Sequence, residues 1–373
     1  MKALTQISRV LVGSLFIVSG LIKANDTLGF SYKLIEYFEV FKMDFFTPWA
    51  VQMAMVICIF EILSGVALLI GIYNKLNTWL LLLLIVFFTF LTGYSVFDAR
   101  IKDCGCFGDA IKLTPVQSFQ KDLVLLVFIL ILFFGQKHLK PLFNKAIGNI
   151  CLFVAVFLTT GFTFYTYMFM PVKDFLPYKL GNNIYELTVV PENAEKDIIE
   201  MVFIYEKDGK QFEFKTEELP ADLDKYTYVD RKDKLIKEGF RAPIHDFKLF
   251  DFNGQELTDS FFRSPGYKLL FVQNKVNEGR TGMETKLNEL AKHVWNRKNM
   301  SIWALSSSSP DELREYQKQH SLIYTFNNMD AVPLKSMVRS NPGIVLLKDN
   351  VVVKKWSAYQ LPSPAELDNY INQ

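Results

Sequence analysis

The chain has 373 residues, half of them hydrophobic, with 34 phenylalanines and a formal net charge of +2. A charge balance so close to zero, without basic clusters interleaved with aromatic residues, excludes nucleic acid as a partner. The composition is uneven, because long apolar runs fill the sequence up to about Met170 and charged residues become frequent beyond it. We therefore expect one half in contact with the lipid bilayer and a second half in water.

Five apolar stretches approach the roughly 20 residues that a helix needs to cross a membrane. They are Ile7 to Ile22, Val51 to Ile72, Thr78 to Phe97, Leu123 to Phe134 with its flanks, and Asn149 to Met170. The first has the basic start of a signal peptide but no small-residue cleavage site, so we expect a retained helix. Basic residues gather in the N-terminus and in the second and fourth loops, whereas the opposite loops also carry acidic residues. The positive-inside rule then predicts a cytoplasmic N-terminus and an external C-terminal half.

The external half divides by pattern into a connector and a larger domain. Alternating residues predict a β-rich connector over 173–240, following a membrane bundle over 1–172, with strands at 184–189 and a hairpin formed by 201–205 and 212–214. From 241 to 373, strands alternate with helices. We expect strands at 247–252, 267–273 and 301–305, a helix at 284–297, helices capped by Ser309 and Ser363, and a closing hairpin of 343–347 and 351–356. This order predicts an open α/β sandwich.

The string Cys104-Gly105-Cys106-Phe107-Gly108-Asp109, CGCFGD, lies in the short loop between the third and fourth spans. Two thiols separated by one residue can form a strained and hence easily reduced disulfide, for which Gly105 supplies backbone freedom. An oxidising compartment would favour it. A permanent structural bridge and a soft-metal site remain alternatives, although two thiolates cannot complete a zinc site and no histidine stands nearby.

Two residues of the second span stand near this chemistry. Cys58, about two turns from the outer end, would resolve a mixed disulfide or serve as a small buried hydrophobe, whereas Cys151 is expected to be inert. Glu61 follows Cys58 at i+3 on nearly the same face. A carboxylate in an apolar span should face the bundle interior with a partner such as Arg9 or Lys23. It would accept a proton in thiol or quinone chemistry, or only fix the register of the helices.

In addition to the CGCFGD loop, the first two spans carry a set of small, aromatic and charged residues: Arg9, Gly13, Phe16, Gly20, Lys23, Glu61, Gly65 and Gly71. Together they resemble the DoxX/MauE group of redox-associated membrane proteins over about the first four spans. The resemblance implies a four-helix bundle connected with disulfide chemistry outside the cytoplasmic membrane.

The external domain, from Ala242 through Asn341-Pro342 to the closing hairpin, is similar to the thioredoxin-like fold, in which Pro342 would be the cis-proline that faces the active site. Chains that join these parts resemble proteins of Bacteroidota. That resemblance implies a bacterial inner membrane with the external domain in the periplasm.

The sequence departs from a redox thioredoxin at the active-site position. After the strand at 267–273 such a protein would carry Cys-x-x-Cys, whereas this chain has Asn274-Lys275-Val276-Asn277, and no cysteine follows Cys151. The external domain therefore cannot exchange disulfides itself. We expect Asn274, Lys275 and Pro342 to form a face that binds a partner or substrate, another periplasmic or inner-membrane protein.

Two functions agree with these patterns. In the first, Cys104 and Cys106 accept electrons from an extracytoplasmic thiol and pass them inward, with a quinone as one acceptor, which makes the protein a thiol–disulfide relay. In the second, the protein is a non-catalytic envelope assembly scaffold whose loop disulfide only staples the bundle. A transporter would rest on Glu61 alone, without internal repeats or discontinuous helices. We prefer the first function and expect no metal site.

Overall fold

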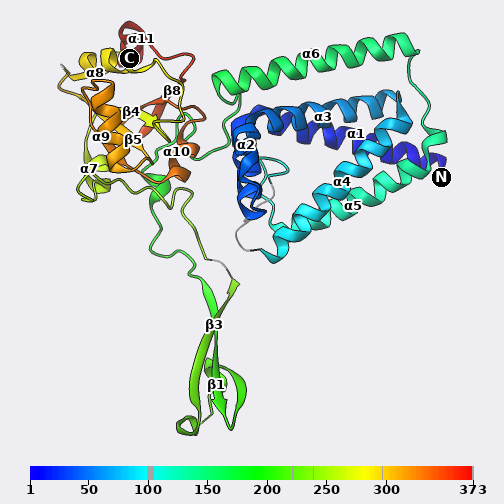
Figure 1. The fold of residues 1–373 in the computed structure, drawn as a ribbon, viewed down its shortest axis with the longest axis horizontal. Helices are drawn as coiled ribbons and strands as arrows, with labels where there is room; N and C mark the ends of the chain where they lie inside the picture. The colour runs from blue at the N-terminus through cyan, green and yellow to red at the C-terminus, as the bar shows by residue number, and fades with distance from the viewer. Residues whose placement is uncertain (99–104, 221, 238, 296, 372–373) are drawn as a thin grey trace. The chain divides into compact units, whose positions relative to one another are not determined.

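The computed structural model describes residues 1–98, 105–220, 222–237, 239–295 and 297–371. The chain divides into two compact units: one comprises Met1–Asn182 with Lys248–Gln373, and the other is Asn183–Phe247. The larger unit contains a helical bundle and an α/β domain, and the smaller unit is mostly a β-sheet (Figure 1). The predicted fold class, a membrane bundle followed by a β-rich segment and a thioredoxin-like domain, is confirmed.

Five helices of the described chain are long and apolar enough to span a membrane, as predicted. They are α1 (Lys2–Asn25), α3 (Ala50–Ile70, preceded by the 3-10 turn η1, Asp44–Trp49), α4 (Asn74–Phe97), α5 (Pro115–Phe134) and α6 (Lys145–Phe169). Helix α1 packs along α3, and α4 packs along α5 (Figure 1). Buried Val12, Phe16, Leu81 and Ile129 join α1, α4 and α5 in one apolar core. A short 3-10 turn, η2 (Gln136–His138), follows α5.

Small residues allow the close contact between α1 and α3. A Cβ atom at Gly65 would lie 2.7 Å from the carbonyl oxygen of Gly13, closer than real Cβ contacts. At the end of α3, the buried guanidinium of Arg9 donates to the carbonyls of Leu68 and Leu69 at 2.9 and 2.6 Å. These carbonyls belong to the last turn and lack helical partners. Arg9 therefore caps α3, so of the two partners expected for Glu61 only Lys23 remains.

The loop between the first and second spans contains a helix that the sequence analysis did not predict, α2 (Thr27–Val40). Asp26 caps its N-terminus, accepting a hydrogen bond from the backbone N–H of Gly29 at 2.8 Å. Phe30 and Phe38 are buried on one face of the helix, whereas Glu39 is exposed on another. The acidic residues gave the segment the composition of a loop, but its apolar residues have helical spacing.

The smaller unit is a three-stranded antiparallel sheet in the order β2-β1-β3. Its strands are β1 (Ile198–Lys207), β2 (Lys210–Lys215) and β3 (Thr227–Lys237), and 3-10 turns occur at Glu186–Thr188, Thr216–Glu218 and Leu223–Lys225. The predicted hairpin is confirmed, with Asp208 and Gly209 at positive φ in its turn. The strand predicted at 184–189 is wrong. Thr188 donates its N–H to the Tyr185 carbonyl at 2.9 Å, so this segment satisfies its backbone locally.

The α/β domain is built on a five-stranded sheet in the order β6-β5-β4-β7-β8. The strands are β4 (Tyr267–Gln273), β5 (Met300–Ser306), β6 (Phe326–Asn328), β7 (Gly343–Lys348) and β8 (Val351–Ser357). Helices α7 (Thr258–Arg263), α8 (Glu284–Trp295), α9 (Pro310–Gln319), α10 (Ala331–Met337) and α11 (Pro364–Ile371) accompany it. Strand β4 is parallel to β5 and antiparallel to β7. This topology is the thioredoxin-like one expected.

Most of the elements predicted for this domain are confirmed, including both capping boxes and the closing hairpin. The Asn341–Pro342 peptide bond is cis, as the resemblance implied. The strand predicted at 247–252 is wrong, since Phe250 makes only isolated bridges to Glu256 and Asn328. Helices α7 and α10 and strand β6 were not predicted because all three are too short to show a periodic pattern.

Candidate functional site

Residues 105–110 of the CGCFGD loop form consecutive tight turns. The backbone N–H of Gly108 donates to the carbonyl of Gly105 at 3.0 Å, and that of Ala110 donates to Phe107 at 3.2 Å. Gly105 and Gly108 have φ angles of +66° and +50°, in the left-handed region that side chains with a Cβ disfavour. Cys104 lies outside the described residues, so Cys106 is the member of the cysteine pair whose surroundings the structure shows.

Cys106 is half-buried, and its backbone is tied to the first membrane helix. The hydroxyl of Ser19 on α1 donates to the carbonyl of Cys106 at 3.0 Å. The same hydroxyl lies 3.3 Å from Oε2 of Glu61 on α3. Ser19 thus joins the thiol loop to the buried carboxylate, and the structure brings together two of the residues that the sequence analysis singled out.

Glu61 forms an ion pair with Lys23, and both side chains are 3% exposed. The Lys23 ammonium also lies over the rings of Phe30 and Phe88, at 5.2 and 5.5 Å from their centres. A charge buried among apolar helices is stable only when paired, so this pair fixes α1 against α3. A single hydroxyl group, that of Ser19, stands between the Glu61 carboxylate and the thiol loop.

A second ion pair lies beside the first. Lys121 contacts Asp122 at 2.8 Å on α5, and Thr92 of α4 donates to the Asp122 carboxylate at 3.0 Å. The two ion pairs, Ser19 and Cys106 line one cavity of about 30 Å³. That volume exceeds the roughly 10–15 Å³ that a cavity needs to hold one water molecule, and the lining offers several polar partners. The site can therefore hold a water between the thiol and the charged groups.

Cys58 is fully buried one turn before Glu61 and packs with Ala24, Phe30, Ala54 and Ile62. Cys58 does not line the small cavity beneath Cys106. Within the described part of the chain, Cys58 and the half-buried Cys151 both occur as unbridged thiols. The surroundings of Cys58 are those of a small core hydrophobe, the second of the two interpretations that the sequence left open.

A larger apolar pocket of about 410 Å³ also reaches Cys106. Its lining comes mostly from α2, α3 and α4 and includes Phe30, Leu34, Phe38, Phe41, Phe87, Phe88 and Leu91. The volume falls in the range typical of small-molecule sites, and an aromatic lining suits a flat apolar ring. The residues present therefore fit a quinone better than a polar cofactor.

No three His, Cys, Asp or Glu side chains among the described residues gather in a group that could hold a metal ion.

The face expected to bind a partner lies around the cis-proline of the α/β domain. Pro342 is buried, Asn274 is half-buried and Lys275 is exposed. The backbone carbonyl of Asn274 accepts the hydroxyl of Ser307 at 2.6 Å, and that of Lys275 accepts the side chain of Asn341 at 2.9 Å. Internal hydrogen bonds thus hold the segment that replaces Cys-x-x-Cys, and its exposed side chains are those of Lys275 and Asn277.

Three features of the site were not found from the sequence. Asp122 could have been, because a carboxylate in an apolar span is the signal that singled out Glu61. Ser19 gave no signal, since serine is common in membrane helices. Arg339 of the α/β domain, which bonds to Asp109 of the CGCFGD loop, gave none either, because the contact joins residues far apart in the chain.

The fold and site together define a membrane bundle with a thiol loop, joined to a thioredoxin-like domain without cysteines. Residues 1–135 match the family model of the methylamine utilisation protein MauE, which confirms the MauE part of the resemblance. Residues 199–238, in the smaller unit, match a domain of unknown function, DUF8463.

Among curated proteins, the chain is 26% identical over 201 residues to protein TlpB of Flavobacterium psychrophilum, an alignment that covers 48% of this chain and 49% of that protein. The chain thus spans about half the length of this relative. Among solved structures, the chain is similar to a candidate disulfide isomerase of Bacteroides thetaiotaomicron. The two are 12% identical with a TM-score of 0.29, and the alignment covers 34% of this chain and 87% of that one. A thiol peroxidase of Chromobacterium violaceum has 14% identity, a TM-score of 0.27, and coverage of 35% and 83%.

Proposed function

We propose that this protein is a membrane thiol–disulfide relay whose redox pair is Cys104 and Cys106. The observation that carries the proposal is the bond from Ser19 to both the Cys106 carbonyl and Glu61, which places a thiol loop directly over a buried, charged cavity. A structural disulfide gains nothing from a charged cavity beside it. A redox thiol can use one, because each thiol that is oxidised to a disulfide releases a proton.

The exchange begins with the loop cysteines joined as a disulfide. A thiolate of an extracytoplasmic dithiol attacks one sulfur, the other loop sulfur leaves as a thiolate, and a mixed disulfide forms. The second thiol of the substrate then attacks that mixed disulfide. The substrate leaves oxidised, and both loop cysteines are reduced.

Reoxidation of the loop removes two electrons and two protons. A bound quinone would supply the acceptor for the two electrons and the two protons, and the apolar pocket of about 410 Å³ that reaches Cys106 supports that class of acceptor. In this scheme Glu61 accepts one of the two protons through Ser19 and the small cavity and then releases it towards the acceptor, and Lys23 stabilises the charged form of Glu61. Cys58 takes no part.

Thiol trapping of the purified full-length protein tests the proposal. In redox buffers of increasing potential, mass spectrometry should find the peptide that carries Cys104 and Cys106 changing from two trapped thiols to none. Cys151→Ser serves as the matched control and should titrate as the native protein does. A loop whose thiol count stays constant across the series would exclude the relay.

The assembly scaffold remains a second candidate because the external domain lacks cysteine and the smaller unit exposes aromatic side chains, among them Phe212 and Tyr228. Under this function the external domain holds another envelope protein and the thiols only staple the bundle. Complementation of cells that depend on the protein distinguishes the two functions. The Cys104→Ser, Cys106→Ser variant should sustain growth if the protein is a scaffold and should fail to do so if the protein is a relay.

A further inference from the structure

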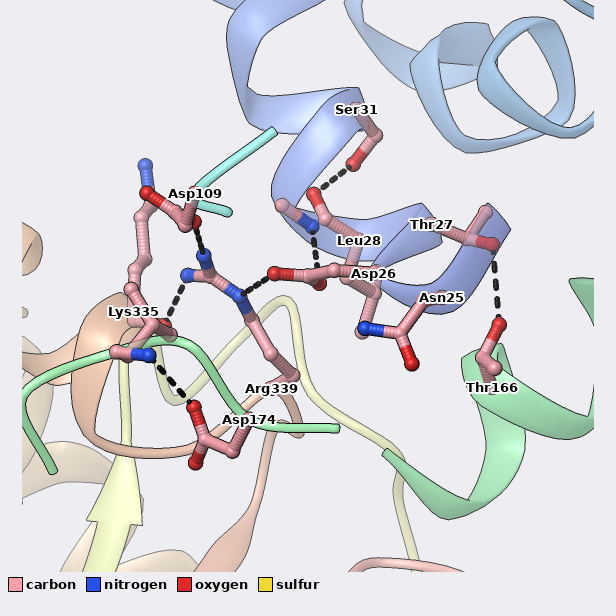
Figure 2. Close-up of polar contacts among 12 residues, drawn as sticks. Asn25, Asp26, Thr27, Leu28, Ser31, Asp109, Thr166, Asp174, Lys335 and Arg339 are labelled. Atoms are coloured by element: carbon pink, nitrogen blue, oxygen red, sulfur yellow. Dashed lines mark hydrogen bonds and ion pairs between the residues drawn. The ribbon is translucent and has the colours of Figure 1, made fainter. Parts of the chain in front are cut away.

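Arg339 of the α/β domain bridges two carboxylates of the bundle. It follows α10 and precedes the cis-proline Pro342, and its side chain is 7% exposed. Its Nε donates to Asp26 at 2.8 Å and its Nη2 donates to Asp109 at 2.8 Å (Figure 2). Its Nη1 donates to the carbonyl of Lys335, so every nitrogen of the guanidinium has a partner.

Two neighbouring carboxylates compensate for the burial of the Arg339 charge. Burial by itself lowers the pKa of the guanidinium, but Asp26 and Asp109 outweigh it and raise the pKa of Arg339 on balance. The planar guanidinium also lies 5.5 Å from the ring centre of Tyr32 on α2. A lysine would supply the charge as a single point and could not reach both carboxylates in fixed directions.

The two carboxylates that Arg339 binds belong to different segments of the bundle. Asp26 is the N-cap of α2, the helix that lines much of the apolar pocket. Asp109 ends the CGCFGD loop, three residues after Cys106. Gly29 lets Arg339 approach, because a Cβ atom there would lie 2.8 Å from its Nη2. One side chain therefore holds the end of the thiol loop against the start of α2.

We propose that Arg339 is a positioning residue that fixes the thiol loop, and that the thioredoxin-like domain thereby acts on the bundle of its own chain. This inference rests on the proposed function for its purpose. The bridge itself concerns the place and exposure of Cys106 and exists whether or not the loop thiols turn over.

Alkylation of Cys106 in the reduced full-length protein, followed by peptide mass spectrometry, tests the proposal. With the bridge removed by Arg339→Gln, the rate at high pH, where the thiol is fully ionised, should rise roughly tenfold, the factor expected from losing a hydrogen bond between charged groups. Asp109→Asn should produce a similar rise, and the double variant should add little to either. Arg297→Gln, which removes an ion pair with Asp368 inside the same domain, is the matched control and should leave the rate unchanged.

The pH profile of alkylation separates positioning from general loosening. Arg339→Gln removes a positive charge beside Asp109, so the midpoint of the Cys106 alkylation profile should move to higher pH. Asp109→Asn removes a negative charge beside Arg339, so the same midpoint should move to lower pH. The other charged groups that line the pockets around Cys106 are the same in both variants: Lys23, Lys33, Glu61, Lys112, Lys121 and Asp122.

The proposal is overturned if Arg339→Gln alkylates at the native rate, if the Arg297→Gln control rises equally, or if both bridge variants shift the midpoint in one direction. Because the assay uses reduced protein and needs no electron acceptor, it stands apart from the redox titration. A loop that fails to titrate but responds to Arg339→Gln would remove the relay and leave the bridge.

Discussion

At the scale of single residues, the ion pair of Lys23 and Glu61 has two candidate roles that one set of variants separates. Glu61→Gln leaves the Lys23 charge buried without a partner and should lower the free energy of unfolding by about 3–5 kcal/mol. The double variant Lys23→Met, Glu61→Leu removes both charges and should recover most of that loss, as denaturant titration in detergent would show.

The same double variant then reports on function. If Glu61 accepts protons, thiol exchange at the loop should fall although the protein is stable. Exchange at the native rate in the stable double variant would leave Glu61 with the purely structural role that the sequence analysis also allowed.

Gly29 supplies a second test at this scale. Gly29→Ala places a methyl group against both members of the bridge, the carboxylate of Asp26 and Nη2 of Arg339, and should raise the alkylation rate of Cys106 about as much as Arg339→Gln does. Gly161→Ala in α6 is the control, because a Cβ atom there meets nothing within 4 Å. The inference is wrong at this point if the two alanine variants behave alike.

The chemically active residues of the site could be predicted from the sequence, whereas the contacts between them could not. Cys106 and Glu61 stand out because thiols and carboxylates are rare beside apolar spans, so composition alone marks them. Their connection through Ser19 depends on how α1 packs on α3, which no local pattern records. The same holds for Arg339, whose partners Asp26 and Asp109 precede it by most of the chain.

At the scale of elements, α8 and α11 are joined by a partly buried cluster. Asp368 of α11 lies 2.8 Å from Nε2 of His293 and 2.6 Å from Arg297. The hydrogen bond from His293, together with the positive charge of Arg297, lowers the pKa of Asp368. A carboxyl whose folded pKa is lowered stabilises the fold at pH values above its unfolded pKa and loses that effect as the pH falls through the folded value.

Asp368→Asn should therefore lower stability by at most about 1 kcal/mol at neutral pH, because the cluster is partly exposed. The difference between native and variant should begin to shrink below about pH 4, where the carboxyl of the unfolded chain becomes protonated, and should go on shrinking as the pH falls towards the lower pKa of the folded state. Thermal unfolding of the full chain between pH 7 and pH 3 measures this. A difference that grows as the pH falls would contradict the assignment.

Elements with long continuous patterns were predicted well. Short elements, and strands that form only when a neighbouring strand pairs with them, were not. Strand β4 was predicted at its observed bounds, because seven consecutive buried residues leave little ambiguity. The strand expected at 247–252 differs from β4 in that apolar and polar residues are mixed along it. No strand pairs with it continuously, so Phe250 makes only isolated bridges. Pairing is a property of the sheet, whereas alternation belongs to the segment.

At the scale of the whole molecule, the relay requires the thiol loop to face the oxidising compartment. Helix α5, a candidate membrane span, lies between the loop and Cys151 in the sequence, so the relay predicts that the two thiols are reached from opposite sides of the membrane. A membrane-impermeant maleimide applied to intact cells after mild reduction should label Cys106 and leave Cys151 unlabelled until the membrane is permeabilised. Labelling in the reverse order would place the loop in the cytosol and remove the proposed function.

The charged residues of α1 also bear on how the chain enters the membrane. Arg9 and Lys23 each oppose insertion by up to about 3 kcal/mol. Most of the polar groups that satisfy them, Leu68, Leu69 and Glu61, are on α3, and another acceptor for Arg9, the carbonyl of Lys140, comes still later in the chain. When α1 leaves the ribosome, these groups have not yet been synthesised. The first helix should therefore remain at the translocon until α3 arrives, so that the two enter the lipid as a hairpin, and nascent chains that stop before residue 50 should integrate poorly.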